Sequence, residues 1–95
     1  MSHVISFMQA KELVKNGAQL IDVRTESEFG QGCLPGATNF PVASLAQELD
    51  NLDHEKDFIV YCRTGGRSAK AQALMEKHGF SSVHNIGSMT NFLND

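Results

Sequence analysis

Short apolar runs alternate along the chain with segments in which apolar residues recur every three or four positions. The apolar runs predict strands, at residues 4–5, 19–23, 38–40, 58–61 and 83–85. The periodic segments predict helices, because that spacing places apolar side chains on one helical face. Strands that alternate with helices form parallel sheets covered on both sides. The pattern therefore predicts an α/β domain with a five-stranded parallel sheet and helices on both faces.

Start and stop signals set the expected helix boundaries. Ser6 with Gln9, and Thr25 with Glu28, have the spacing of capping boxes, and Gly17 ends the first helix. Three further helices are expected. One has an apolar face made of Val42, Leu45, Ala46 and Leu49, and one covers residues 68–78 and ends at Gly79. The last is a terminal helix with an apolar stripe of Met89, Phe92 and Leu93. No repeat or low-complexity segment interrupts this order, so residues 1–95 are expected to form a single domain.

Composition narrows the function classes. Of the 95 residues, 41% are hydrophobic and 20% are charged, which is ordinary for a soluble globular domain. The net charge of −3 argues against a nucleic-acid or anionic-membrane partner. No apolar run approaches the roughly 18 residues that span a bilayer. The N-terminus lacks the basic and apolar segments of a secretory leader, so a cytoplasmic protein is expected.

Cys33 and Cys62 are the only cysteines of the sequence. They are too few for a disulfide scaffold and do not form a Cys-x-x-Cys pair, and no Cys/His cluster has the spacing of a zinc site. Both are expected to be free thiols in a reducing compartment. We therefore expect neither a metal nor an organic cofactor.

The most apolar predicted strand leads directly into the candidate catalytic residue. It ends on Cys62, which is followed by a loop that opens a helix: Arg63, Thr64, Gly65, Gly66, Arg67 and Ser68. A thiol in that position faces backbone N–H groups and the positive end of a helix dipole, with two guanidinium groups close by. These features favour the thiolate, which is the nucleophilic form of cysteine. Cys62 is therefore the candidate nucleophile, and the loop is the candidate anion-binding element.

The size of this loop indicates its ligand. From Cys62 to Arg67 the pattern is Cys-x4-Arg, and Gly65 and Gly66 let the main chain approach an anion closely. Successive N–H groups can then converge on one point. Cysteine enzymes that handle phosphate use one residue more. The shorter loop suits a sulfur anion, such as the outer atom of a persulfide.

Three motifs follow one another along the chain. They are Leu20-Ile21-Asp22-Val23-Arg24 with Glu28-Phe29, then Gly32-Cys33-Leu34-Pro35-Gly36-Ala37, then Val60-Tyr61-Cys62 with Gly65, Arg67 and Ser68. In this order they resemble the single-domain rhodanese-like sulfurtransferases, the thiosulfate sulfurtransferase family, over nearly the whole chain. The second matches the family's Gly-His-Ile-Pro-Gly-Ala segment and the third its catalytic loop. The resemblance implies a rhodanese-like three-layer fold.

The resemblance also implies a two-step sulfur transfer. Cys62 attacks the sulfane sulfur of a small anionic donor such as thiosulfate, releases sulfite and keeps the sulfur as a persulfide. A thiophilic acceptor then removes it: cyanide in the test tube, or a thiol or dithiol, including one on a protein, in a cell. Arg63 is expected to point outward and attract the donor. Arg67 is expected to fold over the loop or to pair with an acid.

Asp22 and Arg24 end the neighbouring strand and are expected to brace the loop from beside it. The alternative for Arg24 is an exposed ion pair with Glu26 or Glu28, which would contribute under about 1 kcal/mol. All four histidines are far from the motifs and are expected to be structural or solvent-facing: His3, His54, His78 and His84.

Three positions depart from the family's pattern. Cys33 stands where the family usually has His, and Ser88 and Phe92 replace the usual Gly and Trp. These positions are interpreted as structural, so we expect little loss of activity. Because Cys33 precedes a strand, we expect it to lie away from the site, with a role as a resolving thiol as the alternative.

Two other function classes fit parts of the sequence. One is a cysteine phosphatase or arsenate reductase, disfavoured by the loop length and by the lack of a general acid in the motifs. The other is a non-catalytic module that senses oxidants or binds a protein through the same pocket. The sequence leaves the physiological donor, the acceptor, the pathway and the oligomeric state open.

Overall fold

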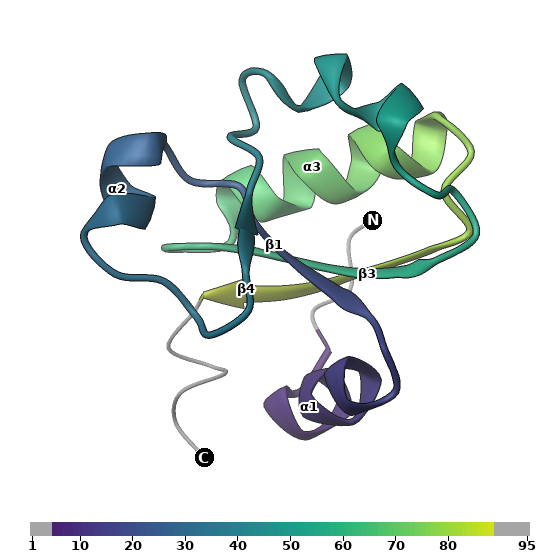
Figure 1. Ribbon diagram of the computed structural model, residues 1–95, viewed down its shortest axis with the longest axis horizontal. Coiled ribbons are helices and arrows are strands. Elements are labelled where there is room, and N and C mark those ends of the chain that lie inside the picture. Colours follow the sequence, from purple (N-terminus) through teal and green to yellow (C-terminus); the bar gives the residue numbers. More distant parts are fainter. Residues whose placement is uncertain (1–4, 89–95) are drawn as a thin grey trace.

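Figure 1 shows the computed structural model of the protein, in which residues 5–88 are described. The helices are α1 (Phe7–Lys15), α2 (Glu26–Gly30) and α3 (Gly66–Lys77), with two 3₁₀ helices, η1 (Leu45–Gln47) and η2 (Leu49–Asn51). The strands are β1 (Gln19–Asp22), β2 (Thr38–Asn39), β3 (Asp57–Cys62) and β4 (Ser82–Ser88). The sheet lies between α1 on one side and α3 with the 3₁₀ helices on the other, which gives the expected three layers (Figure 1).

The described strands form a four-stranded parallel sheet in the order β2-β1-β3-β4, so the prediction of five strands was wrong by one. The missing strand is the one expected at residues 4–5. Val4 lies outside the described residues, and Ile5 belongs to no strand although its N–H donates to Asn85 O at 2.9 Å. Ser6 is the N-cap of α1, so the described chain enters a helix directly after this bond.

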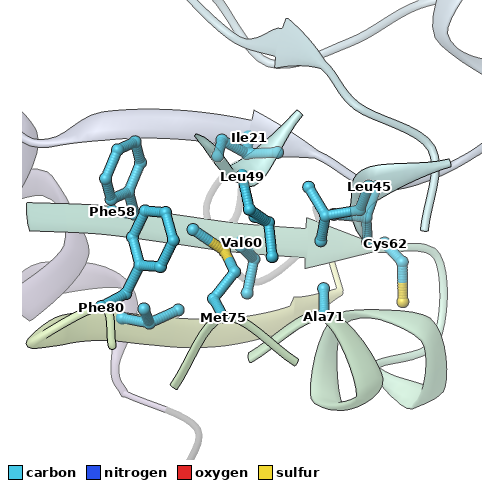
Figure 2. Close-up of a cluster of buried hydrophobic side chains, with 11 residues drawn as sticks. Ile21, Leu45, Leu49, Phe58, Val60, Cys62, Ala71, Met75 and Phe80 are labelled. Atoms are coloured by element: carbon cyan, nitrogen blue, oxygen red, sulfur yellow. The ribbon is translucent and has the colours of Figure 1, made fainter. Parts of the chain in front are cut away.

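β3 is the strand with the strongest apolar signal, and it lies between β1 and β4 in the sheet. Successive side chains of a strand point to opposite faces. Phe58, Val60 and Cys62 accordingly join the cluster under α3, while Ile59 and Tyr61 join the cluster under α1. A strand buried on both faces reads as a continuous apolar run. Figure 2 shows the first cluster, with Cys62 at its end near Ala71 of α3.

Both predicted capping boxes are present. Ser6 and Gln9 cap α1, Thr25 and Glu28 cap α2, and Gly17 has the left-handed φ of 103° just beyond α1. The local signals therefore place these two helices as the sequence predicts.

The segment after Pro41 differs from the predicted helix. It forms η1 and η2, with Leu45 and Leu49 buried, instead of one α-helix. The N–H of Val42 donates to Val23 O beside the sheet, and the turns that follow are closed by bonds between residues three apart, such as Glu48 N–H to Leu45 O and Leu52 N–H to Leu49 O. The helix expected at Met89, Phe92 and Leu93 lies outside the described residues. Within residues 5–88, no helix has the length and apolar character required to cross a bilayer.

Candidate active site

Cys62 is the last residue of β3 and is fully buried at the carboxyl end of the sheet. Two groups of the following loop contact its sulfur. The N–H of Gly65 donates to Cys62 Sγ at 3.0 Å, and the Cys62 thiol donates to Ser68 Oγ at 3.6 Å. The Ser68 hydroxyl in turn donates to Gly65 O at 3.0 Å. The sulfur is therefore held inside a small ring made by the loop itself.

Two opposing effects act on the pKa of the Cys62 thiol. Burial raises it, because a charged sulfur loses solvation. The hydroxyl and N–H of Ser68 and the N–H groups of Gly65 and Thr64 lower it, and together they outweigh burial. The pKa of Cys62 is thus below the usual value for a thiol. The loop favours a nucleophilic thiolate in a position shielded from water.

The backbone of Gly65 creates this geometry. Gly65 is the N-cap of α3 and has a φ of 99°, a conformation that residues with a side chain rarely adopt. No side chain caps α3. The N–H groups of Gly65 and Ser68 interact with the sulfur at this helix terminus, where the helix dipole also favours negative charge. Ser68, one turn into α3, is buried and faces the same atom.

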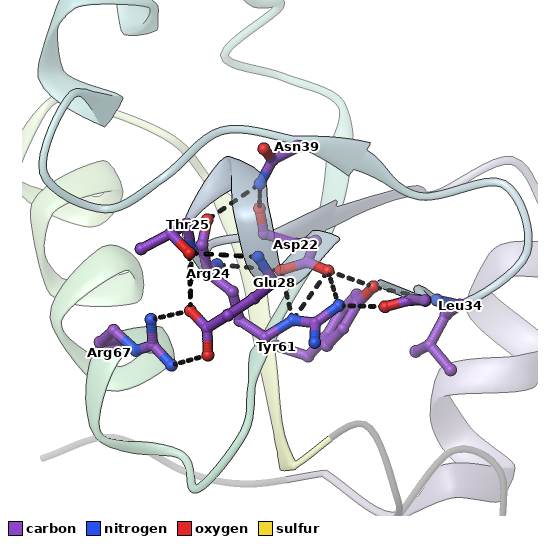
Figure 3. A network of polar contacts seen from close by, with 9 residues as sticks. Asp22, Arg24, Thr25, Glu28, Leu34, Asn39, Tyr61 and Arg67 are labelled. Carbon is purple, nitrogen blue, oxygen red and sulfur yellow. Dashed lines mark hydrogen bonds and ion pairs between the residues drawn. The ribbon is translucent and has the colours of Figure 1, made fainter. Parts of the chain in front are cut away.

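Arg67 was expected either to fold over the loop or to pair with an acid, and it forms an ion pair with Glu28. Its Nη1 and Nη2 donate to Glu28 Oε1 and Oε2 at 2.6 and 3.0 Å, a two-point contact between α3 and α2 (Figure 3). Arg67 and the N–H of Thr25 lower the pKa of Glu28 to about 2. Arg63 is exposed, as expected for a residue that meets an incoming anion.

Asp22 and Arg24 form a buried pair, which rules out the exposed pair of Arg24 with Glu26 or Glu28. Arg24 Nη2 lies 2.6 Å from Asp22 Oδ2, and the side-chain exposures are 6% and 0%. The pKa of the Arg24 guanidinium is raised, and its hydrogen bonds to Asp22 are the largest cause. The carboxylate thus holds Arg24 in place at the end of β1.

Tyr61 and Asn39 complete this network. Tyr61 belongs to the third sequence motif, but neither residue was expected to have a role in the site. The Tyr61 hydroxyl donates to Asp22 Oδ2 at 2.8 Å and accepts from the N–H of Leu34 at 3.1 Å. The Asn39 amide donates to Asp22 O and Arg24 O. Burial raises the pKa of Tyr61, so the hydroxyl stays protonated. The one available signal was a tyrosine at an inward position of an apolar strand. Figure 3 shows the network joining β1, β2 and β3 beside the cysteine loop.

A pocket of about 440 Å³ opens at this end of the sheet. Its lining consists of Arg24, Glu28, Gln31, Gly32, Cys33, Arg63 and Ser88. Arg63 follows Cys62 directly, and Ser88 is the register partner of Cys62 across β3 and β4. The pocket therefore adjoins the cysteine loop. Within the described part of the chain, no group of His, Cys, Asp and Glu side chains could hold a metal ion.

The position of Cys33 corrects the sequence prediction. Cys33 was expected to lie away from the site, but it is exposed and lines this pocket. Arg24 Nη2 donates to Gly32 O at 2.6 Å, and Tyr61 receives the N–H of Leu34. These two bonds fold the turn back over the strand ends. The sequence position before β2 carried no information about that fold-back.

Comparison with protein families gives one match that spans most of the chain. Residues 6–95 match the family model described as "Rhodanese-like domain". A solved structure described as a rhodanese-like domain protein from Staphylococcus aureus superposes with a TM-score of 0.82 at 26% identity, covering 97% of this chain and 91% of that one.

Two relatives whose names state an activity extend the comparison. A protein named sulfurtransferase from Allochromatium vinosum is 33% identical over 67 residues, covering 70% of this chain and 63% of that protein. A protein named thiosulfate sulfurtransferase GlpE from Ectopseudomonas mendocina is 34% identical over 82 residues, covering 86% of this chain and 75% of that protein. The chain spans less than two thirds of the first curated relatives that it matches.

Proposed function

We propose, since the chain belongs to the rhodanese-like domain family, that it is a sulfurtransferase in which Cys62 carries the transferred sulfur as a persulfide. The observation that carries the proposal is the set of donors around a buried sulfur with a lowered pKa. The names of the relatives from Allochromatium vinosum and Ectopseudomonas mendocina support this reaction class.

In the first proposed step, the Cys62 thiolate attacks the outer sulfur of a small anionic donor such as thiosulfate. A bond forms between Sγ and that sulfur, and the bond from that sulfur to the sulfite group breaks. Sulfite leaves with the electron pair. The proposed roles of the loop follow from its position: Arg63 attracts the donor, and the N–H groups of residues 63–68 bind the sulfur charge as an oxyanion hole binds oxygen.

In the second proposed step, an acceptor attacks the outer sulfur of the persulfide. Cyanide takes it as thiocyanate, whereas a thiol or dithiol becomes a persulfide. In both cases the Cys62 thiolate is the leaving group, and a thiol of lower pKa leaves faster. The same contacts that activate Cys62 as a nucleophile therefore also favour its release.

A phosphatase reaction would need a protonated acid near the site to donate to the leaving oxygen. Glu28 is the acid that lines the pocket, and Arg67 keeps it ionised, with its pKa lowered to about 2. This observation disfavours the phosphatase alternative. Turnover of an aryl phosphate at a useful rate would reverse the ranking.

The proposal is tested by incubating the protein with thiosulfate and weighing it. We expect a gain of one sulfur atom that cyanide removes. Cys62→Ser should gain nothing, whereas the matched control Cys33→Ser should gain the sulfur as the wild type does. A wild-type protein that gains no sulfur from thiosulfate or from the monoanionic donor benzenethiosulfonate, or a Cys62→Ser variant that gains it equally, would refute the proposal.

A further inference from the structure

Three guanidinium groups lie around the candidate site, but their charges are not equally available. Arg24 is paired with buried Asp22, and Arg67 is paired with Glu28 through both carboxylate oxygens. Arg63 is exposed, and among residues 5–88 the structure gives it no acidic partner. The charge that the pocket offers to an incoming anion is therefore mainly that of Arg63.

We propose that Glu28 is a specificity-determining residue: by occupying Arg67 it limits the positive charge of the donor site, so that the site favours sulfane-sulfur donors with one negative charge, such as thiosulfonates, over dianionic donors. This inference rests on the proposed function. It assigns to Glu28 an electrostatic effect on the donor and on Cys62, exerted from the pocket wall and through its ion pair with Arg67.

The position of Glu28 supports this assignment. Glu28 lines the pocket that adjoins Cys62, and it is ionised throughout the neutral range because its pKa is lowered to about 2. The pKa of Arg67 is raised, chiefly by its hydrogen bonds to Glu28, and the charge of Cys62 adds a smaller contribution of the same sign. Arg67 thus interacts electrostatically with the reacting sulfur, and Glu28 offsets part of that interaction.

The chain permits a substitution that removes this charge and keeps the local fold. Glu28 is the third residue of α2 and completes a capping box with Thr25. Glutamine supports the same capping box as glutamate. Glu28→Gln should therefore preserve α2 while leaving the guanidinium of Arg67 without its counter-charge. Glu26→Gln is the matched control, because it removes an identical charge from the same helix at a residue that does not make the Arg67 ion pair.

The test compares two donors, thiosulfate as the dianion and benzenethiosulfonate as the monoanion. In Glu28→Gln we expect the KM for thiosulfate to fall by about threefold to fivefold, the range of an exposed charge pair, with a smaller change for benzenethiosulfonate. The effect should diminish as salt is added. Glu26→Gln should leave the ratio of the two kcat/KM values near that of the wild type.

A second readout separates this role from a merely structural one. In a Cys33→Ser background, alkylation of Cys62 by iodoacetamide should have its pH midpoint lowered by about 0.5 unit in Glu28→Gln, because Arg67 then stabilises the thiolate more fully. Loosening of α2 would raise the midpoint or leave it in place. An unchanged donor ratio together with an unchanged or raised midpoint would overturn the proposal.

The two readouts also separate the present inference from the proposed function. If neither donor loads sulfur on the wild type, the sulfur-transfer proposal fails, and the alkylation midpoint alone then decides whether Glu28 controls the charge at Cys62. If the wild type loads sulfur but the donor ratio and midpoint do not move in Glu28→Gln, only the role of Glu28 is refuted.

Discussion

At the scale of single residues, the reactivity of Cys62 depends on a few hydrogen bonds that outweigh its burial. Burial alone would keep the sulfur protonated, because a charged group loses solvation in the interior. Ser68 and the N–H groups of Gly65 and Thr64 reverse that tendency. Changes at Gly65 and Ser68 should therefore alter the chemistry at a cysteine that is itself untouched.

Ser68→Ala should raise the pKa of Cys62, because it removes the hydroxyl that lies 3.6 Å from Sγ. The hydroxyl can rotate to donate to the thiolate, and losing a hydrogen bond of about 1 kcal/mol corresponds to roughly 0.7 pKa unit. The measurement is the pH dependence of alkylation. Ser44→Ala, whose hydroxyl bonds only locally to Pro41 O at 3.3 Å, is the control. An unmoved midpoint in Ser68→Ala would contradict the assignment.

Gly65→Ala should lower the free energy of unfolding by about 1–2 kcal/mol, the cost of a left-handed conformation for an alanine. The added Cβ would lie 3.5 Å from Gly87 Cα, an ordinary contact, so backbone strain is the main cost. Gly66→Ala is the control, since Gly66 opens α3 without a positive φ and has open space around it. Urea unfolding of the two variants should separate them. Equal free energies of unfolding for Gly65→Ala and Gly66→Ala would show that a side chain at position 65 does not strain the backbone.

At the scale of elements, the site is a junction of strand ends and helices. Tyr61 connects β3 to Asp22 of β1 and to the turn at Leu34. Glu28 connects α2 to α3 through Arg67. Each connection joins elements that are distant in the sequence, so each should contribute to the stability of the site as a whole.

Tyr61→Phe should lower the free energy of unfolding by about 1–3 kcal/mol, because it leaves the N–H of Leu34 and one Asp22 oxygen without their shared partner. The turn that carries Cys33 should also loosen. Urea unfolding measures the first effect, and hydrogen exchange at the Leu34 amide measures the second. Unchanged stability with full protection of that amide would contradict the bracing role of Tyr61.

The Glu28–Arg67 pair predicts a specific response to acid. The pKa of Glu28 is lowered from 4.5 to about 2 in the folded protein. A lowered pKa contributes stability that is present above the unfolded value and is lost as the pH falls toward the folded value. The wild type should therefore lose stability between about pH 5 and pH 2 more steeply than Glu28→Gln. Parallel urea series at several pH values test this, and parallel slopes in the two proteins would contradict it.

At the scale of the whole molecule, the features that neighbouring residues encode were predicted correctly more often than the features that depend on tertiary packing. The capping boxes, the central strand and the glycine loop after Cys62 are encoded by neighbouring residues, and the structure places them as expected. The comparisons confirm the rhodanese-like family. The catalytic role of Cys62 and its loop stays a prediction.

One misplaced feature, Cys33, depends on a contact between segments distant in the sequence. The N–H of Leu34 donates to the Tyr61 hydroxyl, 27 residues away. Arg24, by contrast, pairs with Asp22 two residues away, and what the spacing leaves open is that this pair is buried. Of the expected fifth strand, Ile5 makes one bond to Asn85 O directly before Ser6 caps α1, and Val4 lies outside the described residues. The burial of the Arg24 pair and the position of Cys33 could not be deduced from spacing along the chain.

The central claim is that the loop lowers the pKa of the Cys62 thiol below that of an ordinary cysteine, and alkylation by iodoacetamide across a buffer series tests it most directly. The experiment uses the Cys33→Ser variant, so that the exposed thiol does not contribute, with free glutathione as the reference. We predict a midpoint for Cys62 clearly below that of glutathione and below the value of about 8.5 for an unperturbed cysteine. A midpoint equal to or above that of glutathione would contradict the account.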